Sequence, residues 1–228
     1  MSILTDVAEF THDKPVEGCP VDPIIYIVHS DPGVMRSISW TLDGIDLNIR
    51  KCHDAQSFLD NYDQKHPGCV IMDVDLPDLS MQRGLIIGGI NNAVSESTQS
   101  IQLIFWSSRG DVPTLVKAIL GESVPVLEEP DGYDALFDVV RLAARNAVKA
   151  FHRQHEIRSV TCQIANLTSR ERDVLRLAVE GLPSKSIART LGTSVKTIDV
   201  HRHHIKCKTE SGNISSLVRD VLRYDIVV

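Results

Sequence analysis

Short runs of apolar and β-branched residues recur through the first half of this sequence, and stretches with helical periodicity separate them. The runs that predict strands are Ile24–Val28, Leu47–Cys52, Cys69–Met72, Ile101–Trp106 and Val124–Leu127. Helices are predicted around Val34, Ile38 and Leu42, over Asp54–Tyr62 with Asp54 as N-cap, and over Val112–Leu120. This alternation predicts a flavodoxin-like, five-stranded parallel sheet with helices on both faces.

Length and charge indicate a second domain with a different task. The 228 residues, 43% of them hydrophobic, suffice for two cores. Residues 167–228 hold 11 Lys and Arg against 7 Asp and Glu, a net charge of +4, whereas residues 1–166 carry −10. The basic segment can bind a polyphosphate, which the acidic segment would repel.

The sequence lacks several features that would indicate other classes of protein. It has no signal-peptide pattern and no apolar run long enough to span a bilayer, so we expect a cytoplasmic protein without membrane contact. Its five cysteines lack CxxC spacing, which argues against a disulfide framework or a zinc ribbon.

Polar residues follow the predicted strands where a parallel sheet places its reactive site. They are His29-Ser30-Asp31, Asp73, Ser107-Ser108 and Glu128-Glu129-Pro130. This set resembles the receiver domain of two-component response regulators, and Asp73 to Ser80 is similar to that family's phosphoacceptor stretch. The resemblance implies that Asp73 is the phosphoacceptor and Ser107 the switch residue that senses the phosphoryl group.

Three positions depart from the receiver pattern. His29 and Ser30 occupy the place of the acidic pair that holds Mg²⁺, although a one-residue slip would restore one carboxylate through Asp31. Glu129 stands where the family has a lysine before the proline. Because a phosphoryl group adds about one to two negative charges, Glu129 would repel it, so we expect impaired phosphorylation and doubtful Mg²⁺ binding.

The departures leave three interpretations open. The domain is an atypical receiver held in one state or controlled by another signal, such as a ligand, a metal ion or a partner protein. It is alternatively a dimerisation platform, or a compensated site that still accepts phosphate.

The connecting segments are less regular. Glycines at 84, 88 and 89 predict a mobile or rearranged third helix after Leu79. A helix from Tyr133 to His155 would span about 35 Å. It would link the two domains or pair with the same helix of a second chain in a dimer. The alternative is a last receiver helix followed by a disordered linker. We expect an N-terminal arm over 1–23, a receiver-like domain over 24–145, a linker over 146–166 with a hinge at Arg158–Asn166, and a DNA-binding domain over 167–228.

Residues 167–228 predict four helices. Thr168 and Glu171 form a capping box, and Gly181-Leu182-Pro183 ends the first helix. A short helix over Ser184–Leu191, a tight turn at Gly192–Ser194 and a helix within Thr193–Lys208 follow, before a last helix over Ser215–Tyr224. This order is that of a helix-turn-helix domain, in which Ile198 and Ile205 face the core.

The motifs Leu167-Thr-x-Arg-Glu-Arg, Gly181-Leu-Pro-Ser-Lys-Ser-Ile-Ala and Ser194-Val-Lys-Thr-Ile-Asp-Val-His resemble the LuxR-type DNA-binding domain. From Ile24 to Leu222 the chain is similar to response regulators of the NarL/FixJ family. The resemblance implies that Asp199, Val200 and His203 face base edges and that Lys185, Lys196 and Thr197 face phosphates, with Lys206 on the same basic surface.

Two details of this helix remain open. Thr209 stands where the family has an apolar residue, which is expected to loosen the packing. His201, His204 and Cys207 share one helical side, which is compatible with a metal site but is more typical of core or DNA-facing residues.

Together these features predict a transcription regulator that binds double-stranded DNA as a homodimer, with a sensor histidine kinase or another regulatory protein as a possible input. No catalytic residue set and no cofactor motif is recognisable. A flavodoxin-like enzyme fused to a DNA anchor is therefore disfavoured.

Overall fold

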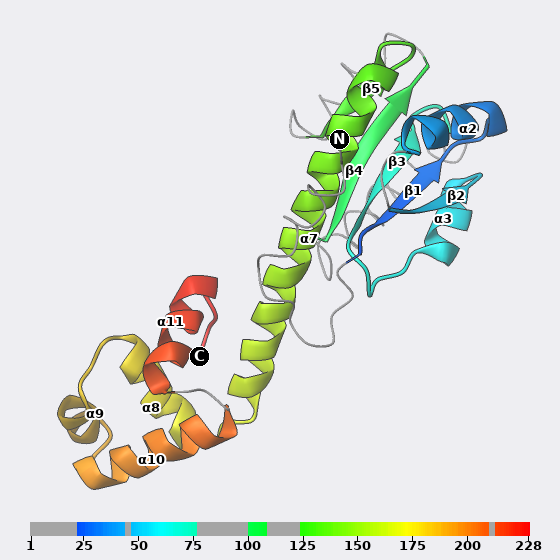
Figure 1. Ribbon diagram of the computed structural model, residues 1–228. Helices are drawn as coiled ribbons and strands as arrows, with labels where there is room; N and C mark the ends of the chain where they lie inside the picture. The colour runs from blue at the N-terminus through cyan, green and yellow to red at the C-terminus, as the bar shows by residue number, and fades with distance from the viewer. Residues whose placement is uncertain (1–21, 44–46, 77–99, 109–123, 210–212) are drawn as a thin grey trace, which may run out of the picture. The chain divides into compact units, whose positions relative to one another are not determined.

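The computed structural model describes residues 22–43, 47–76, 100–108, 124–209 and 213–228 (Figure 1). The chain divides into two compact units, Met1–His152 and Arg153–Val228, which are described separately below. The N-terminal arm up to residue 21, the predicted third helix and the helix over Val112–Leu120 lie outside the described residues.

The first unit contains the predicted parallel sheet. Its strands are β1 (Ile24–Val28), β2 (Asn48–Cys52), β3 (Gly68–Asp73), β4 (Ile101–Ser107) and β5 (Val126–Glu128), in the order β2-β1-β3-β4-β5. All neighbouring strands are parallel, which confirms the predicted fold. Asp73 is level with Trp106, and Ser107 with Glu128, so the polar strand ends meet at one edge.

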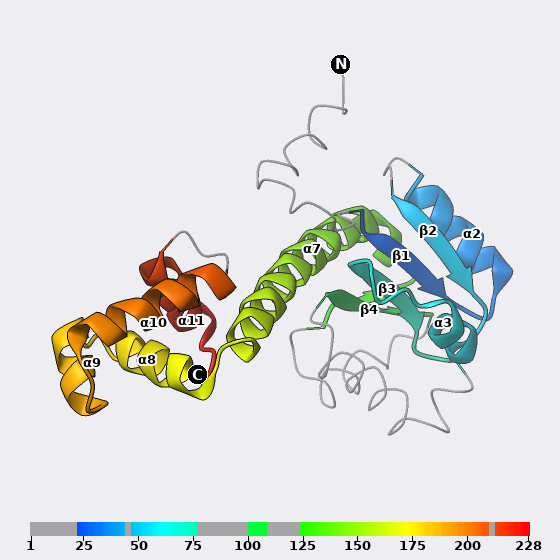
Figure 2. The same ribbon diagram turned by 90° about the horizontal axis from the view of Figure 1, so that it is seen from below.

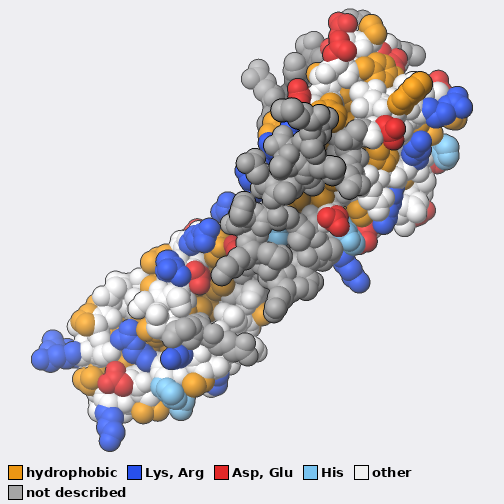
Figure 3. Space-filling view, viewed as in Figure 1, with side chains coloured by type: hydrophobic (Ala, Val, Ile, Leu, Met, Phe, Trp, Pro, Cys, Tyr) orange, Lys and Arg blue, Asp and Glu red, His pale blue; other side chains and the backbone are white. Residues whose placement is uncertain are grey.

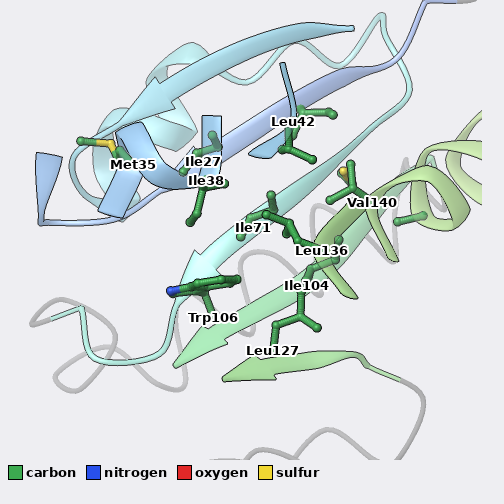
Figure 4. Close-up of a cluster of buried hydrophobic side chains, with 13 residues drawn as sticks. Ile27, Met35, Ile38, Leu42, Ile71, Ile104, Trp106, Leu127, Leu136 and Val140 are labelled. Carbon is green, nitrogen blue, oxygen red and sulfur yellow. The ribbon is translucent and has the colours of Figure 1, made fainter. Parts of the chain in front are cut away.

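Helices lie on both faces of the sheet (Figures 1 and 2). Alternate residues of the strands fill the two cores between them. On one face, α2 (Pro32–Thr41) and the start of α7 (Gly132–Ala165) bury Ile38 and Leu136 against the strands (Figure 4). On the other face, α3 (Ala55–Asn61) buries Phe58. The near-continuous burial of β1 and β3 is what a sheet covered on both faces requires.

Helix α7 is longer than the sequence predicted. It runs for 34 residues, through the segment that we interpreted as a hinge, and ends at Ala165. Residues 133–165 contain neither glycine nor proline, so no residue interrupts the backbone hydrogen bonds. Its last turns supply Val160 and Ile164 to the core of the second unit.

The second unit holds α8 (Ser169–Val179), α9 (Ser184–Thr190), α10 (Val195–Lys208) and α11 (Ile214–Tyr224). Thr168 and Glu171 form the predicted capping box. Ile198 and Ile205 are both buried, as their heptad spacing indicated. The turns before α9 and α10 contain Gly181 and Gly192 at positive φ, a conformation that glycine adopts without steric cost.

Thr209 does not loosen this core. Its side chain is buried, and its hydroxyl donates a hydrogen bond to the carbonyl of Ile205 at 2.8 Å. A buried hydroxyl with a partner costs little, so the polar residue is accommodated where an apolar one was expected. Among the described residues, no helix is both long and apolar enough to cross a bilayer.

The close approach of β3 to β1 gives a first test. A Cβ added at Gly68 would lie 2.2 Å from the carbonyl oxygen of Ile24, so Gly68→Ala must displace a strand. We expect a loss of about 1 to 3 kcal/mol of stability in the first unit. Urea unfolding followed by tryptophan fluorescence measures it, because Trp40 and Trp106 are the two tryptophans of the chain. An unchanged midpoint would contradict the close approach.

Candidate functional site

The strand-end site brings His29 against Asp73. The Nδ1 atom of His29 accepts a hydrogen bond from the backbone N–H of Asp31 at 2.9 Å. An accepting Nδ1 carries no proton, so the ring proton lies on Nε2, which is 3.5 Å from Oδ2 of Asp73. An imidazole N–H therefore faces the carboxylate that the resemblance identified as phosphoacceptor.

Asp31 does not lie beside the carboxylate of Asp73. Its side chain is exposed, and its Oδ1 accepts the backbone N–H of Gly33 at 2.6 Å, which caps α2. Ser30 is also exposed. His29, rather than Asp31, is the residue beside Asp73, so the one-residue slip does not bring a second carboxylate to the site.

Asp73 is only 4% exposed. Burial raises the pKa of this carboxyl, and the negative charges of Asp75 and Glu129 act in the same direction. The backbone N–H of Asp75, at 2.9 Å from Oδ1, and the ring of His29 oppose that rise. The carboxyl is thus buried and held in place.

Glu129 has its own partners. Its Oε1 accepts hydrogen bonds from Nε1 of Trp106 at 3.2 Å and from the hydroxyl of Tyr133 at 2.9 Å. Burial and this bond to Glu129 raise the pKa of Tyr133, and a hydrogen bond with Ser37 of α2 opposes the rise. The carboxylate of Glu129, which follows β5, thus binds side chains of β4 and α7, and Tyr133 extends these contacts to α2.

Ser107, the expected switch residue, is fully buried at the end of β4. Its carbonyl accepts the backbone N–H of Glu129 at 2.9 Å. The structure therefore brings His29, Asp73, Ser107 and Glu129 to one edge, as the sequence predicted from the strand ends.

The donor set at this edge does not fit Mg²⁺. That ion binds through oxygen ligands, and here an imidazole N–H points at Asp73 where a second carboxylate would be needed. Within the described part of the chain, no group of three or more His, Cys, Asp or Glu side chains could hold a metal ion.

The second candidate surface lies on α9 and α10. All seven residues that the sequence placed towards DNA are exposed: Lys185, Lys196, Thr197, Asp199, Val200, His203 and Lys206. Figure 3 shows Lys, Arg and His side chains projecting from this unit. Helix α10 begins at the N-cap Ser194, whose Oγ accepts the backbone N–H of Thr197 at 3.1 Å.

Two contacts fix α10 in its unit, and neither was predicted. Nη1 of Arg202 donates to Oγ of Ser184 at 2.7 Å, which joins α10 to α9. Nζ of Lys208 donates to Oε2 of Glu171 at 2.7 Å, and the same oxygen accepts the backbone N–H of Thr168. Glu171, known from the capping box, thus also anchors the end of α10.

The sequence placed His201, His204 and Cys207 on one side of α10. In the structure, His204 and Cys207 take part in two separate contacts. His204 faces Glu171, with Nδ1 3.9 Å from Oε1. Sγ of Cys207 instead lies 3.6 Å from Nε2 of His203. His201, His204 and Cys207 therefore do not converge on one point.

Sequence reasoning also missed Trp106 and Tyr133. Trp106 was assigned to a buried strand, and only its indole N–H, which needs an acceptor when buried, could have indicated a polar partner. Tyr133 follows Glu129 by four residues, across the turn that begins α7.

The two sites together define a class of protein: a receiver-like sheet domain followed by a helix-turn-helix domain, the organisation of a response regulator. Residues 165–221 match the family of bacterial regulatory proteins described as the luxR family. The solved structure of the response regulator StyR superposes with a TM-score of 0.72 at 26% identity, covering 89% of this chain and all of the other.

Two curated relatives extend the likeness over most of the chain. Response regulator protein TmoT of Ectopseudomonas mendocina is 30% identical over 198 residues, 87% of this chain and 87% of the relative. Transcriptional regulatory protein FixJ of Bradyrhizobium diazoefficiens is 30% identical over 201 residues, 87% of this chain and 94% of the relative. The chain belongs to the NarL/FixJ family of response regulators with a LuxR-type output domain, as its motifs indicated.

The anchor at Glu171 predicts acid sensitivity of the second unit. Burial alone would raise the pKa of Glu171, but the hydrogen bonds from Lys208 and Thr168 outweigh it and lower the pKa to about 2. The stability that this carboxylate contributes is present above its ordinary pKa near 4.5 and is lost as the pH falls towards 2. Because the partner Lys208 is partly exposed to solvent, which screens the pair, the contribution is about 1 to 2 kcal/mol.

Glu171→Gln should therefore lower the calorimetric unfolding temperature of the second unit at neutral pH, and the difference from the native protein should vanish near pH 2. Glu180→Gln is the matched control, because Glu180 makes only an exposed pair with Arg176. Equal effects of the two substitutions would refute the anchor.

Proposed function

We propose that this response regulator binds double-stranded DNA through α10 and that its receiver-like unit does not work by conventional phosphoryl transfer. The proposal for the receiver-like unit rests on the imidazole of His29, whose Nε2 lies 3.5 Å from Oδ2 of Asp73. The proposal that the protein binds DNA is supported by the output domain that it shares with LuxR-type regulators.

In the proposed DNA complex, α10 lies in the major groove. Asp199, Val200 and His203 face base edges, where a carboxylate can accept from cytosine and an apolar side chain can touch a thymine methyl. Lys185, Lys196, Thr197 and Lys206 bind phosphates and set the position of the helix. Their exposure and the fixed position of α10 support this assignment.

In the receiver-like unit, phosphoryl transfer to Asp73 is disfavoured for three reasons. The carboxyl is buried, the imidazole of His29 stands beside it where a second carboxylate would bind Mg²⁺, and Glu129 carries a negative charge where a cation would stabilise the phosphoryl group. The interaction left at the site is the close approach of Nε2 of His29 to Oδ2 of Asp73, 3.5 Å apart.

The remaining assignments follow from DNA binding. The protein acts in the cytoplasm. It binds as a homodimer, because two copies related by a two-fold axis can contact the two half-sites of a DNA operator. Its input comes from a partner protein, such as a sensor kinase that binds the receiver-like unit, or from another signal. The protein acts as a regulator and not as an enzyme.

Loss of two side chains from α10 tests DNA binding. Lys196→Ala combined with His203→Ala should abolish binding to duplexes selected by the native protein from a random pool, measured by fluorescence anisotropy. Lys196→Ala alone should weaken binding to every duplex and lower the salt dependence by about one counterion.

Lys51→Ala removes an exposed lysine from β2 and should bind like the native protein. Circular dichroism must show that the double variant is folded. A folded double variant that binds at native affinity would refute the assignment of α10.

Acetyl phosphate tests the receiver-like unit. With Mg²⁺ present, intact mass spectrometry should find no stoichiometric phosphoryl adduct on the native protein. The combined variant His29→Asp, Ser30→Asp and Glu129→Lys restores the family's acidic pair and lysine, so it should gain an adduct that Asp73→Asn removes. A full adduct on the native protein would overturn the proposal.

A further inference from the structure

The exposed face of α10 contains a second kind of chemistry beside its basic residues. Asp199, His203 and Cys207 recur every four residues, so they lie along one side of the helix. All three are exposed. Nε2 of His203 and Sγ of Cys207 are 3.6 Å apart, and no other imidazole–thiol contact is found in the described residues.

That separation is the one that a tetrahedral metal ion requires. With bonds of about 2.3 Å to sulfur and about 2.0 Å to nitrogen at the tetrahedral angle, the two donor atoms lie roughly 3.5 Å apart. The helix backbone fixes both Cα positions, and the contact between the two side chains already holds the donor atoms together. An ion can therefore be chelated without rearrangement of the helix.

From this geometry we propose that His203 and Cys207 form a binding site for a thiophilic transition-metal ion, with Zn²⁺ as its representative, and that the bound ion competes with DNA for α10. One imidazole nitrogen and one thiolate select such ions over Mg²⁺ and Ca²⁺. On binding, the thiol releases its proton to solvent, the thiolate binds the ion, and the ring keeps its proton on Nδ1.

Two protein ligands leave two tetrahedral positions to water or another small donor. The affinity is accordingly lower than that of a closed four-ligand site, and the ion can exchange. The nearby Asp199 carries a negative charge that partly offsets the repulsion of the cation by Lys206 and Lys208.

The competition with DNA rests on the proposed function. His203 cannot offer Nε2 to a base edge while that atom binds a metal ion, and a hydrated ion occupies space beside the helix. By linkage, DNA must weaken metal binding by the same factor as the ion weakens DNA binding.

Metal binding is measured first, on the full chain without DNA. Zn²⁺ is titrated against a chromophoric chelator, and Co²⁺ is used to detect the thiolate charge-transfer band. His203→Ala and Cys207→Ser should each lose this site and the band.

Cys162→Ser and His204→Ala are the matched controls. Cys162 is the other exposed cysteine among the described residues, and His204 is the neighbouring imidazole that faces Glu171. Both controls should bind as the native protein does. Undiminished binding with a thiolate band in Cys207→Ser, or loss in His204→Ala, would overturn the site.

DNA competition is measured next, with a duplex selected by the metal-free protein in the presence of a chelator. Saturating Zn²⁺ should weaken binding of the native protein on the order of tenfold and leave Cys207→Ser unaffected. Equal binding with and without Zn²⁺ would overturn the competition. If no duplex is selected, the proposed DNA function fails, whereas the metal titration still decides whether the site exists.

Discussion

The parallel register of the sheet determines what this protein can do with its strand-end residues. Because β1, β3, β4 and β5 all point the same way, residues that are distant in sequence finish at one edge. The level pairing of Asp73 with Trp106 and of Ser107 with Glu128 leaves little freedom in how their side chains meet. The side chains at that edge differ from the receiver pattern at positions 29, 30 and 129, while the sheet that presents them is the predicted parallel sheet.

His29 and Glu129 have polar partners in their surroundings. An anion at position 129 would be costly if it only replaced a cation, since a charge without partners is poorly tolerated in a partly buried site. Here the indole of Trp106 and the hydroxyl of Tyr133 supply two donors to the same oxygen. His29 likewise uses both ring nitrogens, one as acceptor from Asp31 and one towards Asp73. The hydrogen bonds at this edge therefore give Nδ1 of His29 and Oε1 of Glu129 partners within the protein.

The sequence predicted most of what local rules control. Apolar runs located the strands, capping residues located the start of α3 and α8, and the heptad spacing of Ile198 and Ile205 identified the buried side of α10. The sequence did not predict contacts between residues that are far apart in the chain. It also did not predict how far a helix extends when no residue interrupts it. The Lys208–Glu171 pair spans 37 residues, and α7 continued because no residue stopped it. The choice of His203 over His204 as the neighbour of Cys207 depends on rotamers, which spacing does not determine.

The contacts of α10 constrain how any signal can reach the DNA surface. Arg202 and Lys208 bind Ser184 and Glu171, so the middle and the C-terminal end of the helix are held by residues of its own unit. A change at Asp73 therefore has no need to fold or unfold α10, whose shape is set locally. Under the proposed function, control from the receiver-like unit acts on the pairing of two chains and hence on the spacing of two recognition helices. An ion on His203 and Cys207 would act differently, because it changes the reading surface itself, and the two inputs would then be independent.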